Sequence, residues 1–344
     1  IQAIKDAIDR GMVLGAPNRW ESQLAAIICE RFPSIDLVRF TNSGTEANLM
    51  ALGAARAFTG REKIMVFEGG YHGGVLYFAH GASPLNAPFD VVMGAYNEID
   101  PTMAAIEASA DDLAAVIIEP MMGAGGCLPG DPKFLTALRD ITMRHGIILI
   151  FDEVMTSRSS IGGLQKRLGI TPDMTTLGKY MGGGASFGGF GGRADIMELF
   201  NPTKPNALVH AGTFNNNVIT MAAGLAGLSE IFTEGVAEAH YLRGNEFRDR
   251  LNSLIAERGL ALQFTGIGSI LGFHTHNRPI HTPSDASDDA PDKQTLIHLE
   301  MMLRGFVYAT RGYFALSLAL SDTDLDDFEK AFDDVISIHA DLLV

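Results

Sequence analysis

Three short segments combine residue types that can do chemistry with backbone patterns that would position them. The first, residues 42–47 (NSGTEA), follows a strand-like run and opens a helical pattern. Ser43 or Thr45 can cap this helix, Gly44 allows a sharp turn, and the free N–H groups at the helix start can bind a phosphate or a carboxylate. An ordinary helix cap that binds nothing has the same pattern, so both interpretations stay open.

The second segment places a carboxylate at the end of the most strand-like run in the chain. Asp152 ends the apolar segment 147–152 (IILIFD), and in open α/β sheets ligands bind at the carboxyl ends of the strands. A carboxylate there can bind a metal ion, hold a proton on a ring nitrogen, or simply cap the turn that follows. Metal binding would need more carboxylates or histidines nearby, and the neighbouring sequence has none in a recognisable spacing.

The third segment, residues 177–184 (LGKYMGGG), places a lysine among glycines and apolar residues. Because desolvation lowers the pKa of an amine, Lys179 is a candidate nucleophile that forms a Schiff base. A surface lysine in a flexible loop is the competing interpretation. Together, the three segments have the anchors of a pyridoxal 5'-phosphate site: a helix start for the phosphate, Asp152 for the pyridine nitrogen and Lys179 for the aldehyde.

A fourth segment suggests different chemistry. Residues 184–188 (GASFG) match the G-x-S-x-G nucleophile elbow of α/β-hydrolases, which would make Ser186 the nucleophile of a serine hydrolase. The elbow must lie between a strand and a helix. Here the glycines continue to Gly192 and no helix clearly follows, so we interpret the match as a coincidence within a glycine-rich segment.

The potential metal ligands do not form a recognisable motif. The chain has two cysteines, Cys29 and Cys127, which cannot make a disulfide framework and lack metal-ligand spacing. His274, His276 and His281 lie close together, but they adjoin a predicted loop and have no cysteine or acid at ligand spacing. We therefore expect solvated histidines and no bound metal.

The elements that position these groups follow from the apolar pattern of the first two thirds of the chain. Short, continuously apolar runs alternate there with helical patterns, which predicts βαβ units and an α/β fold whose mostly parallel sheet is covered by helices. The predicted strands are 37–40, 63–67, 113–118 and 147–152, and the predicted helices are 45–58 and 131–145.

The pattern changes after about residue 225, where helical segments bracket shorter strand-like runs. We predict a large domain over residues 1–225 and a smaller α+β domain over residues 226–344. The acidic segment 282–292, with its two prolines, is predicted to be a solvated loop. The helical patterns of the smaller domain are 221–256 and 294–303, and its strand-like runs are 262–264, 269–274 and 313–318.

The composition excludes several functional classes. The net charge of −15 over 344 residues argues against electrostatic binding to nucleic acid or to an anionic membrane. No apolar run is long enough to span a bilayer, and the charged first residues are not a signal peptide, so we expect a cytoplasmic protein. The chain does not begin with Met, and we expect that it starts inside a longer protein.

Taken together, these segments resemble the class III aminotransferases of the fold-type I pyridoxal phosphate enzymes, and the likeness covers nearly the whole chain. It implies a large domain with a mostly parallel seven-stranded sheet, a smaller C-terminal α+β domain and pyridoxal 5'-phosphate as the cofactor. Members of this family usually have a further N-terminal stretch before the segment that matches Ile1. The segments that carry the resemblance are NSGTEAN (42–48), EGGYHG (68–73), IIEPMMGAGG (117–126), ILIFDEV (148–154), LGKYMGGG (177–184) and HAGTFNNN (210–217).

The resemblance also implies roles for individual residues. Lys179 would carry the cofactor as a Schiff base and then move the proton, and Asp152 would pair with the pyridinium nitrogen. Thr213 would reach the phosphate of the neighbouring subunit, which implies a homodimer, and Arg311 would bind a substrate carboxylate. The remaining cofactor contacts would be Ser43, Gly44 and Thr45 to the phosphate, and Tyr71 and Val154 to the two ring faces.

Within the family, residues 306–328 resemble the β-amino acid branch. The first hypothesis is therefore a transaminase that moves the amine of a β-phenylalanine-like substrate to 2-oxoglutarate or pyruvate. A glutamate-1-semialdehyde aminomutase is the alternative within the same fold. A serine hydrolase that uses Ser186 and a non-catalytic relative are the more distant alternatives, and the intact Lys179 and Asp152 speak against the latter.

Overall fold

The computed structural model describes residues 1–79, 81 and 83–343, which divide into two compact units. Unit 1 comprises Ile1–Pro120 and Gly130–Ala237, and unit 2 comprises Met121–Pro129 and Glu238–Val344. The division thus falls at Ala237 rather than at the predicted residue 225, and a short internal segment belongs to unit 2. The change in sequence pattern at 225 marks the end of one helix inside unit 1 and not the end of that unit.

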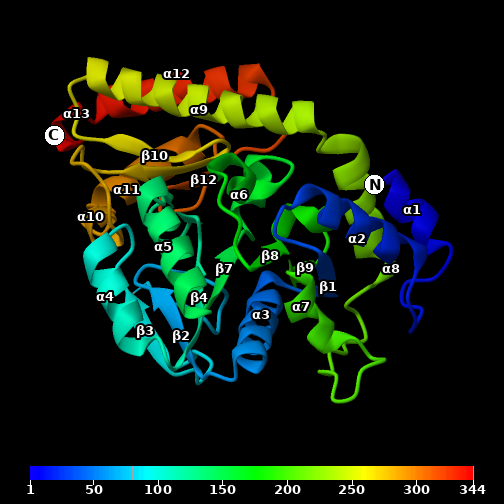
Figure 1. Ribbon diagram of the computed structural model, residues 1–344. Helices are drawn as coiled ribbons and strands as arrows, with labels where there is room; N and C mark the ends of the chain where they lie inside the picture. The colour runs from blue at the N-terminus through cyan, green and yellow to red at the C-terminus, as the bar shows by residue number, and fades with distance from the viewer. Residues whose placement is uncertain (80, 82, 344) are drawn as a thin grey trace. The chain divides into compact units, whose positions relative to one another are not determined.

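Unit 1 is built on a seven-stranded sheet in which neighbouring strands are mostly parallel (Figure 1). One strand, β9, runs antiparallel to both of its neighbours, β8 and β1. This architecture confirms the α/β fold class inferred from the sequence. In spatial order the strands are β1 (Leu37–Thr41), β9 (Gly188–Gly192), β8 (Met174–Gly178), β7 (Ile148–Asp152), β4 (Leu113–Ile118), β2 (Lys63–Phe67) and β3 (Val91–Gly94).

Both faces of this sheet are buried because alternate side chains of each strand point to opposite sides. In β2, Ile64 and Val66 belong to the apolar cluster that the alanines of α3 help to form. Phe67 points the other way, and its ring meets that of Phe134 in α5 at 5.9 Å. The helices of unit 1 are α1 (Gln2–Ile8), α2 (Arg19–Arg31), α3 (Gly44–Thr59), α4 (Ile99–Ser109), α5 (Pro132–His145), α6 (Gly163–Leu168), α7 (Ala194–Met197) and α8 (Val218–Ala226).

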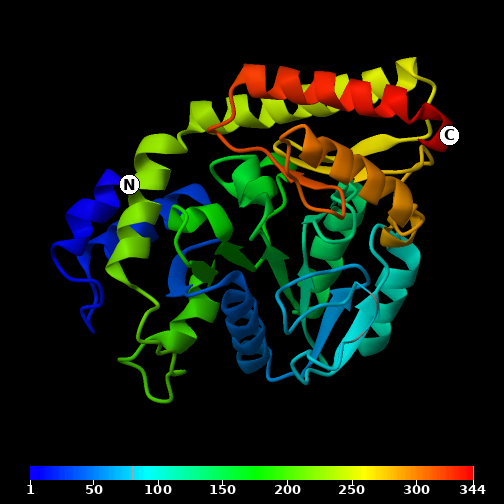
Figure 2. The ribbon, with the colours of Figure 1, turned by 180° about the vertical axis from the view of Figure 1, so that it is seen from behind.

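Unit 2 contains a three-stranded antiparallel sheet and a core of aromatic rings. Helices α9 and α12 lie side by side in both views (Figures 1 and 2), and the rings of Phe247 and Phe328 meet between them at 5.7 Å. The sheet order is β10 (Gln263–Ile267), β11 (Ile270–His274) and β12 (Tyr313–Ala315), and β5 (Met121–Met122) pairs with β6 (Leu128–Pro129). The helices are α9 (Glu234–Glu257), which begins in unit 1, α10 (Pro283–Ala286), α11 (Pro291–Leu303), α12 (Asp322–Ile338) and α13 (Ala340–Leu343).

Two predictions about local structure are wrong. The helix predicted over 221–256 is interrupted, because α8 passes into a π-helical turn at Gly227–Ile231 before α9 begins. The predicted loop 282–292 contains the short helix α10, which Thr282 and Asp285 hold with a reciprocal capping box. Over the described part of the chain, no helix combines the length and the apolar character that crossing a membrane requires.

Candidate active site

The carboxyl ends of the parallel strands in unit 1 bring together most of the residues singled out in the sequence. Strands β1, β2, β4, β7 and β8 all end at one edge of the sheet, and the loops that follow them surround a cavity of about 310 Å³. The predicted residues that line this cavity are Ser43, Gly44, Thr45, Tyr71, Asp152, Val154 and Lys179, together with Ser186 of the alternative hypothesis.

The helix start after β1 presents free backbone donors to this cavity. The Oγ of Ser43 accepts a hydrogen bond from the Glu46 amide at 3.1 Å and so caps α3. Among the described residues, none accepts from the amides of Gly44 and Thr45. A Cβ at position 44 would lie 2.8 Å from the Cγ2 of Val154, so any other residue there would push the Val154 side chain aside. The two free amides and the helix dipole make this a site for an anion such as phosphate.

A network of buried hydrogen bonds fixes the carboxylate of Asp152, which is 3% exposed. Its Oδ2 accepts from the Nδ2 of Asn48 at 2.8 Å and lies 2.8 Å from the Nδ1 of His72. Its Oδ1 accepts from the Val154 amide at 3.0 Å. Asn48 is held in turn by the hydroxyl of Thr176, at 2.6 Å from its Oδ1. Because Oδ1 has one protein donor, it can accept a further hydrogen bond from a protonated ring nitrogen.

No local sequence pattern indicated a role for His72 or Asn48. Burial lowers the pKa of His72, but the hydrogen bond and the negative charge of Asp152 outweigh this effect, so the net pKa lies above its ordinary value. In its protonated form, His72 makes a buried ion pair with the Asp152 carboxylate. Their positions were the one available sign of a role, because His72 directly follows Tyr71 and Asn48 lies one helical turn beyond Gly44.

Lys179 follows β8 with a backbone φ of 52°, in the left-handed region that residues other than glycine rarely adopt. The prediction of a lysine desolvated among apolar side chains is wrong, because Lys179 is exposed and lines the cavity. Among the described residues, none forms a hydrogen bond or ion pair with its Nζ. An unusual backbone conformation thus directs an unpaired amine into the cavity, as is common at functional sites.

Ser186 also lines the cavity, but its surroundings do not form a nucleophile elbow. A 3-10 turn, Lys179–Gly182, precedes it and strand β9 follows it, whereas the elbow requires a strand before and a helix after the serine. Within the described part of the chain, no histidine or acid hydrogen-bonds its hydroxyl. The structure therefore gives Ser186 no activating base.

Two predicted residues do not line the cavity. Thr213 lies exposed on the loop before α8 and lines a different hollow of unit 1 with Arg39 and His210. Arg311 belongs to unit 2, where its guanidinium lies 5.4 Å from the ring centre of Tyr313. The roles of both residues stay predictions.

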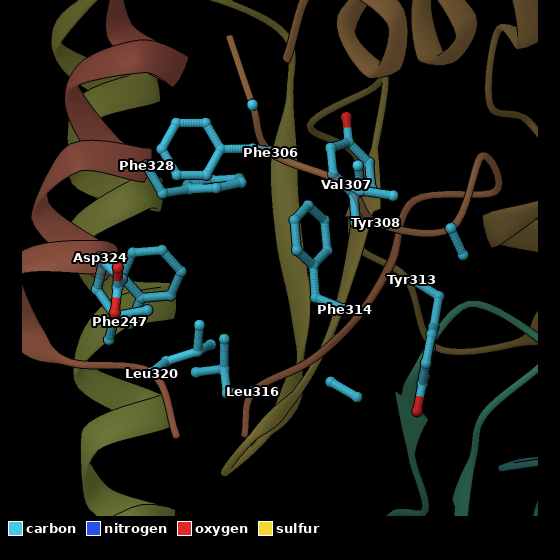
Figure 3. Close-up of a pocket in the computed structure, with 14 residues that line it drawn as sticks. Phe247, Phe306, Val307, Tyr308, Tyr313, Phe314, Leu316, Leu320, Asp324 and Phe328 are labelled. Atoms are coloured by element: carbon cyan, nitrogen blue, oxygen red, sulfur yellow. The ribbon is translucent and has the colours of Figure 1, made fainter. Parts of the chain in front are cut away.

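Unit 2 has a cavity of its own, of about 480 Å³ (Figure 3). The labelled rings of Phe306, Tyr308, Phe314 and Phe328 surround it, and Asp324 is its one carboxylate among the described residues. Its lining includes no lysine, histidine, cysteine or serine in the part of the chain that the structure describes. It therefore lacks the nucleophile and base that the cavity of unit 1 brings together.

Comparison with known proteins agrees with this geometry. The family model of the class III aminotransferases matches residues 1–336. The β-phenylalanine transaminase of Variovorax paradoxus is 49% identical over 99% of this chain and 78% of its own length. A crystal structure of a β-phenylalanine aminotransferase from the same organism has a TM-score of 0.97 and 49% identity, covering 99% of this chain and 79% of that one. A transaminase solved with pyridoxal phosphate bound is 28% identical, with a TM-score of 0.89, over 98% of this chain and 81% of that one.

The fold and the site thus define a pyridoxal phosphate-dependent transferase of fold type I. The chain belongs to the class III aminotransferase family, and it is a pyridoxal phosphate-dependent aminotransferase. The cavity fits this cofactor on its own evidence, because it offers free amides at a helix start, a carboxylate oxygen with room for another donor, and an unpaired amine. The ring of Tyr71, which is 44% exposed, adds an accessible aromatic surface.

Proposed function

We propose that this protein transfers the amino group of a β-amino acid, such as β-phenylalanine, to a keto acid such as 2-oxoglutarate or pyruvate. The observation that carries the proposal is the 49% identity to a β-phenylalanine transaminase over 99% of the chain. The groups around the cavity of unit 1 support the cofactor chemistry of this proposal: the free amides of Gly44 and Thr45, the carboxylate of Asp152 and the amine of Lys179.

In this proposal, the residues of the cavity hold the cofactor at three points. Gly44 and Thr45 donate their free amides to the phosphate, with Ser43 capping the helix that presents them. Asp152 accepts from the ring nitrogen, and Lys179 binds the aldehyde carbon. Tyr71 and Val154 cover the two ring faces. When bound, pyridoxal phosphate supplies an electron sink for the charge left on the substrate carbon after a proton is removed.

The chain's own residues then position and move protons. Asn48 and His72 hold the carboxylate of Asp152 in place, and its hydrogen bond from the ring nitrogen would keep a proton there. With substrate bound, the Nζ of Lys179 would be a free amine beside the amine-bearing carbon. It would remove the proton from this carbon and deliver it to the cofactor carbon that takes up the amino group, acting as a general base and then as a general acid.

Substrate binding and assembly are the finer parts of the proposal. Arg311 would bind the substrate carboxylate through the paired donors of its guanidinium. Thr213, which is exposed, would contact the phosphate in the neighbouring subunit of a homodimer. A cytoplasmic location completes the proposal and rests on the sequence.

Incubation of the purified protein with pyridoxal phosphate, racemic β-phenylalanine and 2-oxoglutarate tests the proposal. We expect glutamate to form in proportion to the loss of one β-phenylalanine enantiomer, and no product without the keto acid. A protein that ignores β-phenylalanine but isomerises glutamate-1-semialdehyde without an external keto acid would refute the β-amino acid assignment.

A further inference from the structure

Three side chains of unit 2 converge at the carboxyl end of β11. His274 ends this strand, and His276 follows two residues later, after a bend at Thr275; the two imidazole rings lie with their centres 6.0 Å apart. Asp289 reaches them from the turn that precedes α11. One possible ligand atom from each of the three side chains lies within 4.8 Å of the other two.

The prediction of solvated histidines is wrong for two of the three. His274 is 2% exposed and His276 is 8% exposed, while His281 is exposed and outside the cluster. The acid that the sequence analysis did not find is Asp289, which a short helix and two loops separate from the histidines along the chain. The folded chain therefore supplies a ligand that no local spacing could indicate.

The hydrogen bonds of His274 orient it as a metal ligand. Its Nε2 lies 3.0 Å from the carbonyl oxygen of Gly126, which can accept the ring proton. Its Nδ1 lies 2.8 Å from the Oδ2 of Asp289. When Nε2 donates to this carbonyl, the lone pair of Nδ1 faces Oδ2 of Asp289, and a cation bound by these two atoms would replace their direct hydrogen bond.

The carboxylate of Asp289 is fixed in the same manner. Its Oδ1 accepts from the Thr275 amide at 2.5 Å and from the Thr275 hydroxyl at 3.2 Å. Its Oδ2 faces His274 and accepts from Gln294 at 3.0 Å. Thr275 thus holds Oδ1 in place, and Oδ2 is the oxygen that faces His274.

His276 gives independent evidence for a ligand at this cluster. It is more than nine-tenths buried, and neither of its ring nitrogens has a hydrogen-bond partner. Buried polar groups without partners are rare in native proteins because leaving them unpaired is costly. Coordination of a cation by one of these nitrogens would satisfy it.

We propose that His274, His276 and Asp289 bind one divalent transition metal ion of the zinc class. Two imidazole nitrogens and one carboxylate oxygen are ligands that Zn²⁺ prefers, and a water molecule would complete its four-fold coordination. The ion would join the end of β11 to the turn before α11. Its role is structural, because none of these residues lines the cavity that holds Lys179.

Metal titration of the purified full-length enzyme with its cofactor tests this site. The protein is treated with a chelator, titrated with Zn²⁺ and passed through a sizing column, and the retained metal is quantified. We expect one Zn²⁺ per chain, bound about tenfold or more weakly after His276→Ala or Asp289→Asn. Asp289→Asn keeps an oxygen that can accept from Thr275, so it removes the charged ligand with little change in the fold.

His281→Ala is the matched control, since it removes a nearby exposed histidine outside the cluster. We expect His281→Ala to bind Zn²⁺ as tightly as the unchanged protein does. After titration with Co²⁺, which reports its ligands through visible absorption bands, it should show the same bands as the unchanged protein. Metal that binds elsewhere, including at the cofactor, should also bind to His276→Ala. Only the metal that the unchanged protein retains and His276→Ala loses is assigned to the site. Equal Zn²⁺ binding by the unchanged protein, His276→Ala and Asp289→Asn would overturn the proposal.

Discussion

Two buried polar groups, Asp152 in unit 1 and His276 in unit 2, differ in how completely they are hydrogen-bonded. In unit 1, the carboxylate of Asp152 has donors on both oxygens, and every donor comes from an element that the parallel sheet brings to one edge. In unit 2, the core is a cluster of aromatic rings, and the buried His276 has no partner. A satisfied network fixes the geometry of a reactive site, whereas an unsatisfied group marks a place where the protein can still acquire a ligand.

The largest effect that would test this comparison is expected at the amine of unit 1. Lys179→Ala removes the group that we assign to cofactor attachment and proton transfer, so initial transamination rates should fall about 10⁴-fold or more. The unfolding free energy should barely change, since Lys179 is exposed. Lys330→Ala, at an exposed position in unit 2, is the control. A Lys179→Ala enzyme within tenfold of the unchanged rate would contradict the assignment.

In unit 2, the largest expected effect is on stability. Phe264 is buried, and its ring contacts those of Phe273, Phe314 and Phe332. Phe264→Ala should therefore lower the free energy of unfolding by about 3–5 kcal/mol, as measured by urea denaturation. Leu303→Ala, at a 79% exposed position, should have little effect. Equal effects of the two substitutions would argue against the aromatic core.

Neutralising the carboxylate of unit 1 should have the next largest effect. Asp152→Asn preserves the shape of the side chain but cannot hold a proton on the ring nitrogen by charge. We expect kcat to fall about 10²- to 10³-fold, the usual range for loss of one electrostatic contact to the reacting group. Asp112→Asn removes an exposed carboxylate of the same unit and should leave kcat unchanged. If both variants kept full activity, Asp152 would not be the partner of the ring nitrogen.

His72 is expected to act through Asp152, with a smaller effect. His72→Phe fills the same space without the hydrogen bond to Oδ2, and we expect kcat to fall about 10- to 100-fold, as when a residue that orients a ligand is lost. The binding constant for pyridoxal phosphate should weaken together with kcat. A loss of stability with an unchanged kcat would show that His72 is only structural.

The raised pKa of His72 adds a pH dependence with a defined sign. Because the folded-state pKa exceeds the ordinary value of 6.5, the charged pair with Asp152 contributes its full stability below that value and loses it as pH rises through the raised pKa. The difference in unfolding free energy between the unchanged protein and His72→Phe should therefore be larger at about pH 6 than at about pH 9. A difference that grows with pH would contradict this.

The smallest effect is expected at an exposed ion pair of unit 2. Arg258 donates two hydrogen bonds to Asp333 at 2.7 Å, on the surface between α9 and α12. Arg258→Ala should change the unfolding free energy much less than Phe264→Ala does, because water screens exposed pairs. A change as large as that of Phe264→Ala would mean that surface charge, and not the aromatic core, stabilises unit 2.

Sequence patterns predicted some strands of unit 1 and missed others for a physical reason. Strands buried on both faces, such as β4 and β7, are continuously apolar and stand out from the neighbouring helices. Strand β9 consists of four glycines and one phenylalanine and has no such pattern. Its glycines are required by packing, since a Cβ at Gly188 would lie 2.0 Å from the carbonyl oxygen of Ser43.

The candidate site was only partly predictable for a similar reason. Residues at strand and helix ends, such as Asp152 and Ser43, are visible because local patterns mark those ends. His72 and Asn48 matter through contacts with a carboxylate far along the chain, and no local pattern encodes them. In the same way, Asp289 joins His274 only after unit 2 has folded.

The absorbance spectrum of the protein with pyridoxal phosphate, recorded before and after addition of racemic β-phenylalanine without a keto acid, tests the central claim most directly. We expect the band of the bound aldehyde form to be replaced by that of the amine form, and 2-oxoglutarate to reverse the change. Lys179→Ala should not show this cycle. A bound cofactor whose spectrum ignores β-phenylalanine would contradict the proposed substrate, and failure to bind the cofactor at all would contradict the site.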